Sequence, residues 1–391
     1  MELLFWILLG LLFYTYIGYG MLIAVLAKAR QFLKKSQPKQ YIKNDPGLPN
    51  VCLLVAAYNE EDFIQQKIEN CFEQDYPKDK LTYFFVSDGS NDRTAEIIKR
   101  FSEIKAFHKN ERKGKIAAVQ RVMPFVNSEI VVFTDANTLL NRDAVFNLLR
   151  HFKENKIGAV AGEKRIQIES SMGASAAGEG IYWKYESLIK KWESLFHTVV
   201  GAAGELFAIR AELYEAVEND TLVEDFHMTI NIAAKGHSVV YDSEAYAIEG
   251  PSNDISEEFK RKKRIAAGGW QAAYRLRKLL NPFRYGLLSF QYFSHRVLRW
   301  TIAPLCLPLL LLVNIHLALT GSIYFQVLLF LQCLFYLLAI VGWLAEQNKM
   351  KFKVFFVPFY FCFMNFAVFA GLYSLLKGEQ SVVWEKANRK K

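Results

Sequence analysis

A carboxylate stands at the end of an apolar run that has the pattern of a buried strand. The stretch "EIVVFTDAN" reaches its polar end at Asp135, and Asn137 lies where a second carboxylate would complete a metal clamp. Two earlier apolar runs end in the same way, at Glu60 and at Asp88. Ligands of open α/β sheets bind at the carboxyl ends of the strands. We therefore expect these polar side chains to gather at one edge of a sheet and to bind a ligand there.

The elements that would position these side chains alternate along the polar middle of the chain, about 45–280. Strand-like runs at 51–59, 81–92 and 129–137 alternate with helical patterns at 61–74, 93–101 and 115–126. Strands that alternate with helices of this length indicate a mainly parallel sheet covered on both faces. The expected fold class is α/β.

Apolar segments flank this region. Residues 1–28 are long enough to cross a bilayer, and 299–376 contains about three more such runs, roughly 299–320, 323–345 and 354–376. Segment 281–298 is apolar but interrupted by charge, which suits a helix lying in the membrane interface. We expect transmembrane helices around a polar domain that spans 45–280.

Lysine and arginine positions predict the orientation of the chain. Lys28, Arg30, Lys34 and Lys35 directly follow the first apolar segment and mark that side as cytoplasmic. Three spans after the domain would place the basic tail 377–391 outside, against the same rule. Either one apolar segment does not cross, or the tail is an exception.

The composition narrows the class of protein further. The chain has 391 residues, 52% of them hydrophobic, and a formal net charge of +9. Many of its cations flank the apolar segments, where anionic lipid headgroups account for them without nucleic acid. The five cysteines have no spacing typical of a zinc site or a disulfide framework.

Seven short motifs occur in an order that resembles the membrane-bound glycosyltransferase family 2, which includes cellulose, hyaluronan and poly-N-acetylglucosamine synthases. This family has a GT-A fold that binds nucleotide sugars. The resemblance covers nearly the whole chain. The motifs are "VAAYNEE", "VSDGSND", "KGKIAAVQ", "FTDAN", "GAAGELFAIR", "VEDF" and "RKKRIAAGG".

The resemblance implies a set of residues that bind the nucleotide-sugar donor. Glu60 could accept a hydrogen bond from the imide of uracil, and Asp88 could contact the base or ribose or be a simple turn carboxylate. Lys115 matches a basic residue near the diphosphate, although a solvated surface lysine would fit the same pattern. The full expected set is Tyr58, Glu60, Asp88, Lys115, Asp135, Arg261 and Arg264.

The resemblance also implies a metal site, because Asp135 matches the first carboxylate of the family's DxD motif. Asn137 replaces the second carboxylate. An amide oxygen is a legitimate ligand for Mg²⁺ or Mn²⁺, but it is neutral and therefore weaker. We expect a Mg²⁺ or Mn²⁺ site at Asp135 and Asn137 with reduced affinity.

Glu224 and Asp225 match the family's acidic pair below the acceptor. A sugar hydroxyl is a poor nucleophile, so a carboxylate must take its proton during the attack. Asp225 is the expected general base, although the pair could instead stabilise the start of a helix. The family also places acceptor and donor-sugar contacts at Gly204, where the backbone can approach a sugar closely.

The family's QxxRW motif is altered in this chain. Arg264 keeps the arginine, but Arg261 replaces the glutamine, and Ile265 replaces the tryptophan on which an acceptor sugar would stack. The aromatic residues of 182–196 could form a sugar platform or could simply pack. These changes predict transfer of one or a few sugars rather than a long polymer.

The sequence thus predicts an inverting glycosyltransferase in the cell (inner) membrane, with a cytoplasmic catalytic domain. It would transfer sugar from a donor, expected to be UDP-linked, to a saccharide or lipid-linked acceptor in cell-surface glycan synthesis. One alternative is a transferase that loads a single sugar onto a polyprenyl-phosphate lipid. Another is a non-catalytic membrane component that binds sugar nucleotides, which the altered metal motif would suit.

Overall fold

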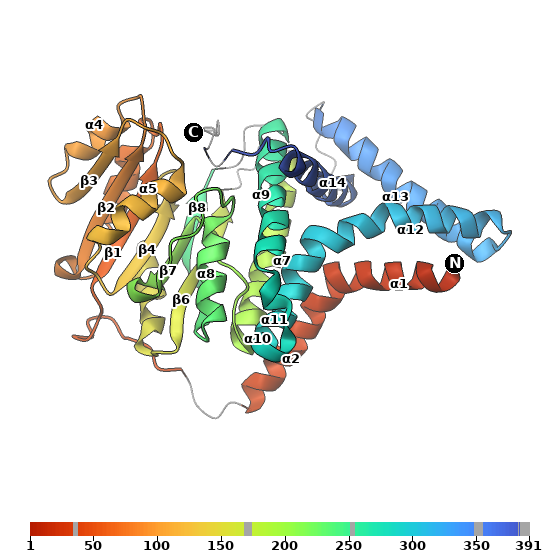
Figure 1. The fold of residues 1–391 in the computed structure, drawn as a ribbon, viewed down its shortest axis with the longest axis horizontal. Coiled ribbons are helices and arrows are strands. Elements are labelled where there is room, and N and C mark those ends of the chain that lie inside the picture. The colour runs from red at the N-terminus through yellow and green to blue at the C-terminus, as the bar shows by residue number, and fades with distance from the viewer. Residues whose placement is uncertain (34–37, 168–173, 251–254, 348–354, 382, 384–391) are drawn as a thin grey trace.

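The computed structural model describes residues 1–33, 38–167, 174–250, 255–347, 355–381 and 383. Within these residues, eight strands form one sheet in the order β3-β2-β1-β4-β7-β6-β8-β5 (Figure 1). The first four strands of this order pair in parallel, whereas β7 runs antiparallel to both of its neighbours. The strands are β1 (Val51–Ala57), β2 (Leu81–Asp88), β3 (Ile104–Lys109), β4 (Ile130–Asp135), β5 (Thr138–Leu140), β6 (Ile157–Ile166), β7 (Leu206–Arg210) and β8 (Ser238–Glu249).

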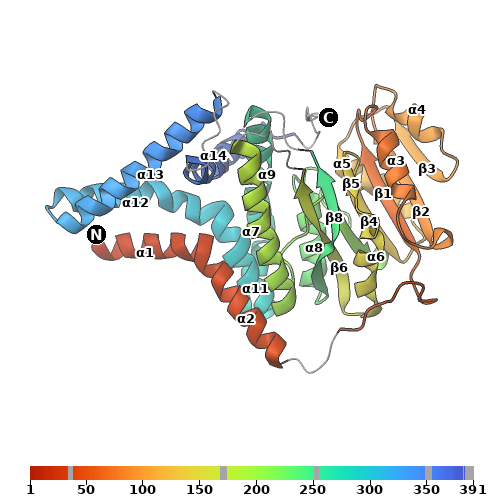
Figure 2. The ribbon, with the colours of Figure 1, turned by 180° about the vertical axis from the view of Figure 1, so that it is seen from behind.

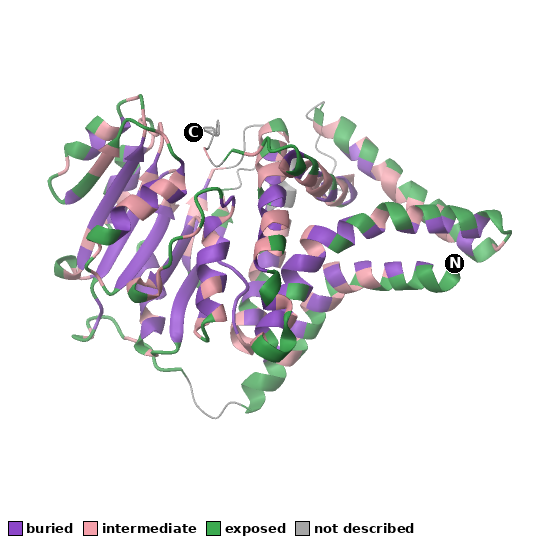
Figure 3. Cartoon of the chain, viewed as in Figure 1, coloured by how far each residue is buried: buried purple, intermediate pink, exposed green. Residues whose placement is uncertain are grey.

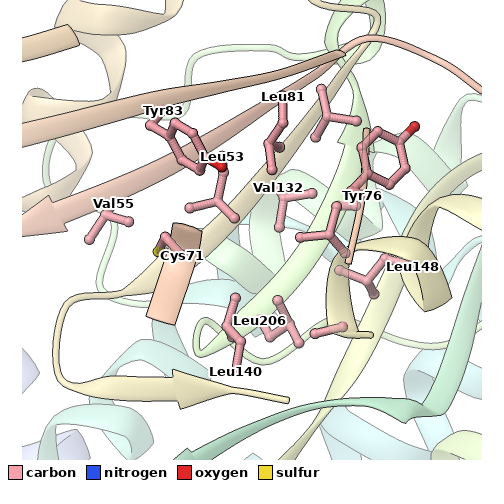
Figure 4. Packing of buried hydrophobic residues seen from close by; sticks show 14 of the residues in the cluster. Leu53, Val55, Cys71, Tyr76, Leu81, Tyr83, Val132, Leu140, Leu148 and Leu206 are labelled. Atoms are coloured by element: carbon pink, nitrogen blue, oxygen red, sulfur yellow. The ribbon is translucent and has the colours of Figure 1, made fainter. Parts of the chain in front are cut away.

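Helices cover both faces of the sheet, and the predicted mainly parallel α/β fold is confirmed. Alternate residues of β1 face opposite layers: Leu53 and Val55 pack in one core cluster, and Cys52 and Leu54 in the other. The first face is covered by α3 (Ile64–Phe72), α4 (Thr94–Lys99) and α6 (Ala144–Leu149), and the second by α5 (Lys115–Val122) and α8 (Glu224–Ala234). Figure 4 shows part of the first layer.

Burial on both faces explains why the central strands read as continuous apolar runs rather than alternating ones. All residues of β1 except Ala56 are buried, as are all residues of β4 except Asp135. The buried surface ends at the carboxyl edge of the sheet, where polar side chains begin. Figure 3 shows the same division, with a buried sheet and more exposed loops around it.

Four helices are long and apolar enough to cross a membrane: Glu2–Leu33, Leu287–Leu319, Ile323–Gln347 and Val357–Leu376. The first consists of α1 (Glu2–Phe13), a π-helical turn η1 (Tyr14–Gly18) and α2 (Tyr19–Leu33). The second consists of α11 (Leu287–Tyr292), a π-helical stretch η7 (Phe293–Ile302) and α12 (Ala303–Leu319). The others are α13 (Ile323–Gln347) and α14 (Phe356–Leu376).

The segment expected to form a separate interfacial helix, 281–298, is divided in the structure. Residues Pro282–Tyr285 form the short helix α10, and from Leu287 onward the chain is continuous with α12. Hydrogen bonds hold this second part against the domain: Gln291 donates to the carbonyl of Thr198, and Tyr292 to the carbonyl of Ala272. Two of the polar residues that suggested an interfacial helix also make internal contacts: His295 is hydrogen-bonded to Glu193, and Arg296 pairs with Glu186.

Two long helices, α7 (Ala174–Phe196) and α9 (Ile255–Arg275), lie between the sheet and the apolar helices (Figures 1 and 2). In both views α1, α12 and α13 extend away from the sheet, whereas α14 lies beside α9. A Cβ on Gly371 of α14 would lie 2.7 Å from the backbone nitrogen of Ala267, so the two helices touch through their backbones. Phe259 of α9 also packs against Phe363 and Phe366 of α14.

Candidate functional site

A cavity of about 500 Å³ opens at the carboxyl edge of the sheet and reaches α7, α9 and η7. Its wall contains every residue that the sequence analysis assigned to the site: Tyr58, Glu60, Asp88, Lys115, Asp135, Asn137, Gly204, Glu224, Asp225, Arg261, Arg264 and Ile265. The predicted residues are therefore brought together in one place. Their individual roles stay predictions.

Asp88, at the end of β2, is buried and bonded to the loop that precedes α5. Its carboxylate accepts hydrogen bonds from the backbone N–H groups of Lys113 (3.2 Å) and Gly114 (2.6 Å). Gly114 has a φ of 92°, a left-handed conformation that glycine adopts without strain. Since Lys115 follows directly, Asp88 fixes the point from which the lysine side chain enters the cavity.

Lys115 connects the metal motif with the acidic pair. Its Nζ lies 2.6 Å from Oδ1 of Asp135 and 3.3 Å from Oε1 of Glu224. Burial disfavours the charged amine, but Asp135 and Glu224 outweigh it and raise the pKa of Lys115. Lys115 is thus a charged residue inside the cavity rather than a solvated surface lysine.

Asp135 is partly buried and lies near other carboxylates. Burial raises the pKa of Asp135, Lys115 opposes this effect, and the charges of Glu205 and Glu249 add to it. Further positive charge at this carboxylate would therefore be favourable.

Asp225 lies in the first turn of α8, where its Oδ1 accepts a hydrogen bond from the N–H of Phe226 (2.8 Å). Burial, assisted by the charge of Glu224 and opposed by Lys115, raises the pKa of Asp225 to about 7. A Cβ on Gly204 would lie 3.2 Å from Oδ2 of Asp225, so glycine keeps this face of the carboxylate accessible. Such a carboxyl group can take up a proton near neutral pH.

Arg261 and Arg264 enter the cavity from α9 in different environments. Arg261 pairs with Glu258 (3.1 Å) and Glu249 (3.4 Å). Arg264 donates to the carbonyl of Leu222 (3.3 Å), and burial lowers the pKa of Arg264. The charges of Glu224, Asp225 and Asp135 oppose this effect, and a guanidinium stays charged at any physiological pH.

Several cavity residues were missed by the sequence reasoning. Arg112 stacks on Tyr58, with 3.6 Å between its guanidinium carbon and the ring centroid. Lys164 forms ion pairs with both Glu205 and Glu249. Arg296 comes from η7, and an arginine within an otherwise apolar helix is a signal for function that could have been used.

The cavity wall includes Tyr182 and Trp183, two of the aromatic residues of 182–196 that were considered as a sugar platform. Ile265 is 41% exposed and lines the cavity, as predicted. Trp183 of α7 and Trp300 of η7 line it too. Although Ile265 stands where the family has a tryptophan, the cavity wall therefore still contains aromatic side chains from other elements.

Asp135 and Asn137 are the residues that could hold a divalent metal ion. Among the described residues, no three His, Cys, Asp or Glu side chains are grouped as a metal site. Mg²⁺ in nucleotide sites is commonly held by one or two protein carboxylates together with substrate phosphates, so a larger group is not required. The carboxylate of Asp135 and the amide of Asn137, which line the cavity together, fit such a partial site.

The chain is similar to known glycosyltransferases. The sequence model described as "Glycosyl transferase family 2" matches residues 52–217, a stretch that ends before Asp225. The probable glycosyltransferase YdaM of Bacillus subtilis (strain 168) is 25% identical over 89% of this chain and 88% of its own length. The poly-beta-1,6-N-acetyl-D-glucosamine synthase of Staphylococcus epidermidis is 27% identical over 63% of this chain and 59% of its own length. The match therefore covers less than two thirds of that synthase.

A solved structure has the same fold. The mannosyltransferase PcManGT from Pyrobaculum calidifontis, in complex with GDP-Man and Mn²⁺, superimposes with a TM-score of 0.69. The superposition covers 96% of this chain and 100% of that one, at 22% sequence identity. The fold is GT-A-like, and residues 52–217 of the chain are similar to the family 2 glycosyltransferases.

Proposed function

We propose that this protein transfers a sugar, with inversion, from a nucleoside-diphosphate donor to a hydroxyl of a saccharide or glycolipid acceptor at the membrane. The observation that carries this proposal is the environment of Asp225. A carboxyl group with a pKa of about 7 lines the same cavity as the pair of Lys115 and Asp135. A site that only binds nucleotide sugars would need no such group.

The donor would lie along the edge formed by β1, β2 and β4. Glu60 can accept a hydrogen bond from a base imide, which suits uracil, and Tyr58 with its stacked Arg112 borders the same end of the cavity. Lys115 and Arg264 would stabilise the charge that develops on the diphosphate as the sugar departs. A divalent cation held by Asp135 and Asn137 would supply further neutralisation of that charge.

The acceptor would approach Asp225 over Gly204. Asp225 takes the proton from the attacking hydroxyl as a single displacement forms the new bond at the anomeric carbon, and this inverts its configuration. Glu224 is bound to Lys115, so it assists by raising the pKa of Asp225 rather than by attacking the sugar.

We infer that the domain faces the cytoplasm of the cell and that the helices Glu2–Leu33, Leu287–Leu319 and Ile323–Gln347 cross the inner membrane. Helix α14 would lie along α9 at the membrane surface. The support for this is that Glu379, Ser381 and Val383, which follow α14, line the same cavity as the catalytic residues. The chain after α14 is then on the cytoplasmic side, in agreement with its basic composition.

The proposal is tested by incubating the purified protein, in lipid nanodiscs, with a panel of labelled UDP- and GDP-sugars and a membrane lipid extract. We expect transfer of label from one nucleotide class to a saccharide or lipid product, and inversion at the anomeric carbon by NMR. Tight binding of a donor without transfer to any acceptor would contradict the enzymatic assignment and favour a binding component.

A further inference from the structure

Lys190 of α7 is a buried cation that the proposed catalytic steps do not use. Its side chain lines the cavity and the residue is 4% exposed. In the described part of the chain it has no ion pair and no hydrogen bond, only the ring of Trp183 at 5.8 Å. A charged amine that is buried without a partner is unfavourable. Such a residue, directed into a cavity, points to a ligand that supplies the missing partner.

The carboxylates around Lys190 already have other cationic partners. In the described residues, the carboxylates at this end of the cavity are each shared between two cations. Glu186 pairs with Arg296 and Arg299, Glu249 with Lys164 and Arg261, and Glu258 with Arg261 and Lys262. Burial lowers the pKa of Lys190, and the charge of Arg296 acts in the same direction, against the charges of Glu186, Glu205 and Asp225.

Lys190 and Arg296 lie away from the end of the cavity that is proposed to bind the donor. Arg296 belongs to η7, which continues into the apolar helix α12, and its Nε donates to the carbonyl of Val200 (3.0 Å). Lys190 belongs to α7, between the sheet and the apolar helices (Figure 2). The charge of Asp225 also acts on Lys190, so the group lies on the side of the cavity from which an acceptor would reach the base.

We propose that Lys190 and Arg296 form a subsite for an oxyanion carried by the acceptor. This inference rests on the proposed function, because only a transferase has an acceptor. The binding of an oxyanion at Lys190 and Arg296 can nevertheless be measured without sugar transfer. A phosphate on a lipid-linked acceptor and the carboxylate of an acidic sugar share the required chemistry. Trp183 and Trp300 offer apolar faces for the uncharged remainder of the same molecule.

The test is direct binding, which does not require turnover. Hexyl phosphate, hexyl glucuronide and hexyl glucoside have the same alkyl chain and differ in charge. Their binding to the full chain in nanodiscs would be measured by tryptophan fluorescence, for the wild type, Lys190→Met, Lys190→Arg and Lys191→Met. Lys191 is the matched control, because it is the next residue of the same helix and is exposed.

We expect the wild type to bind at least one anionic ligand roughly tenfold or more tightly than the glucoside, as charged hydrogen bonds imply. The preference should vanish in Lys190→Met and persist in Lys190→Arg and Lys191→Met. Preference for the phosphate alone identifies a lipid phosphate, and preference for the glucuronide alone identifies an acidic saccharide.

Equal binding of all three ligands to the wild type would overturn the proposal, and so would an anion preference that survives in Lys190→Met. If Lys190→Met does not fold, the comparison of the three ligands on the wild type still tests whether the cavity prefers an anion. Donor binding, measured separately, should not change in Lys190→Met, which distinguishes this subsite from the diphosphate site. An anion preference without any sugar transfer would leave the subsite standing and remove the proposed function.

Discussion

The carboxylate of Asp225 is partly buried beside Glu224 and Lys115, and the balance of these effects raises its pKa to about 7. The sequence indicated Asp225 as a candidate base through its motif. It could not supply the pKa, because that depends on burial and on Lys115, a residue that is 110 positions earlier in the chain. The motifs could therefore predict which residues line the cavity, but they could not predict the pKa values of these residues.

The raised pKa predicts how activity depends on pH. A general base must be deprotonated, so kcat/KM should rise about tenfold per pH unit below pH 7 and level off above it. Lys115 lowers the pKa of Asp225, so Lys115→Met should move this limb to higher pH as well as reduce the rate. A profile that is flat between pH 5 and 8, or a limb that stays in place in Lys115→Met, would exclude this assignment.

The amide at position 137 predicts that the metal ion binds weakly. Asn137→Asp adds a charged oxygen ligand, so the Mn²⁺ or Mg²⁺ concentration for half-maximal activity should fall roughly tenfold. The exposed Asn127, which does not line the cavity, gives the matched control Asn127→Asp, and this variant should not differ from the wild type. Full activity in EDTA would contradict a metal-dependent mechanism.

At the scale of elements, apolar runs and their polar ends predicted the strands and the edge at which the site lies. Strand β4 ends at Asp135 as expected, since residues buried on both faces must be apolar until the sheet ends. The aromatic residues of 182–196 were a possible sugar platform, but the sequence could not predict which of them would line the cavity together with η7. Trp183 and Arg296 are 113 positions apart, and only tertiary packing brings both to the cavity.

The contact between α14 and α9 gives a prediction at the same scale. In Gly371→Ala the new Cβ would meet backbone atoms of Lys263 and Ala267 at 2.8 and 2.7 Å, and backbone cannot move as a side-chain end can. We expect a loss of about 1–3 kcal/mol in stability, as for overpacked cores. Activity should fall too, because α9 carries Arg261 and Arg264. The measurement is thermal unfolding in detergent.

The control for this variant is Gly10→Ala. Gly10 is also a helical glycine of an apolar helix, but a Cβ there would meet no atom within 4 Å. It should unfold at the wild-type temperature. Equal stability of Gly371→Ala and Gly10→Ala would mean that α14 and α9 do not depend on this close contact.

At the scale of the whole molecule, the sequence left a conflict between three C-terminal spans and a basic tail. Residues 379–381 and 383 follow α14, and three of them line the catalytic cavity, so the end of α14 lies on the side of the domain. Hydropathy could not reveal this, since α14 is as apolar as a spanning helix. The packing of α14 on α9 distinguishes it from α1, α12 and α13, which extend away from the sheet.

This arrangement predicts on which side of the membrane two points of the chain lie, and protein fusions at these points can test it. A fluorescent protein joined after residue 391 should be fluorescent in a bacterial host, and alkaline phosphatase at that point should be inactive. Fusions made in the turn 320–322, between α12 and α13, should give the reverse result. An active phosphatase after residue 391 would show that α14 crosses the membrane.

The most direct test of the central claim is the paired measurement of turnover and donor binding in Asp225→Asn. The amide keeps the size of the side chain but cannot accept the proton. Turnover should therefore fall by roughly 10²–10⁴, while the donor Kd stays within about twofold. Asp220→Asn, at an exposed carboxylate of the preceding loop, should behave as the wild type. Near-normal turnover in Asp225→Asn would contradict the account and place the base elsewhere.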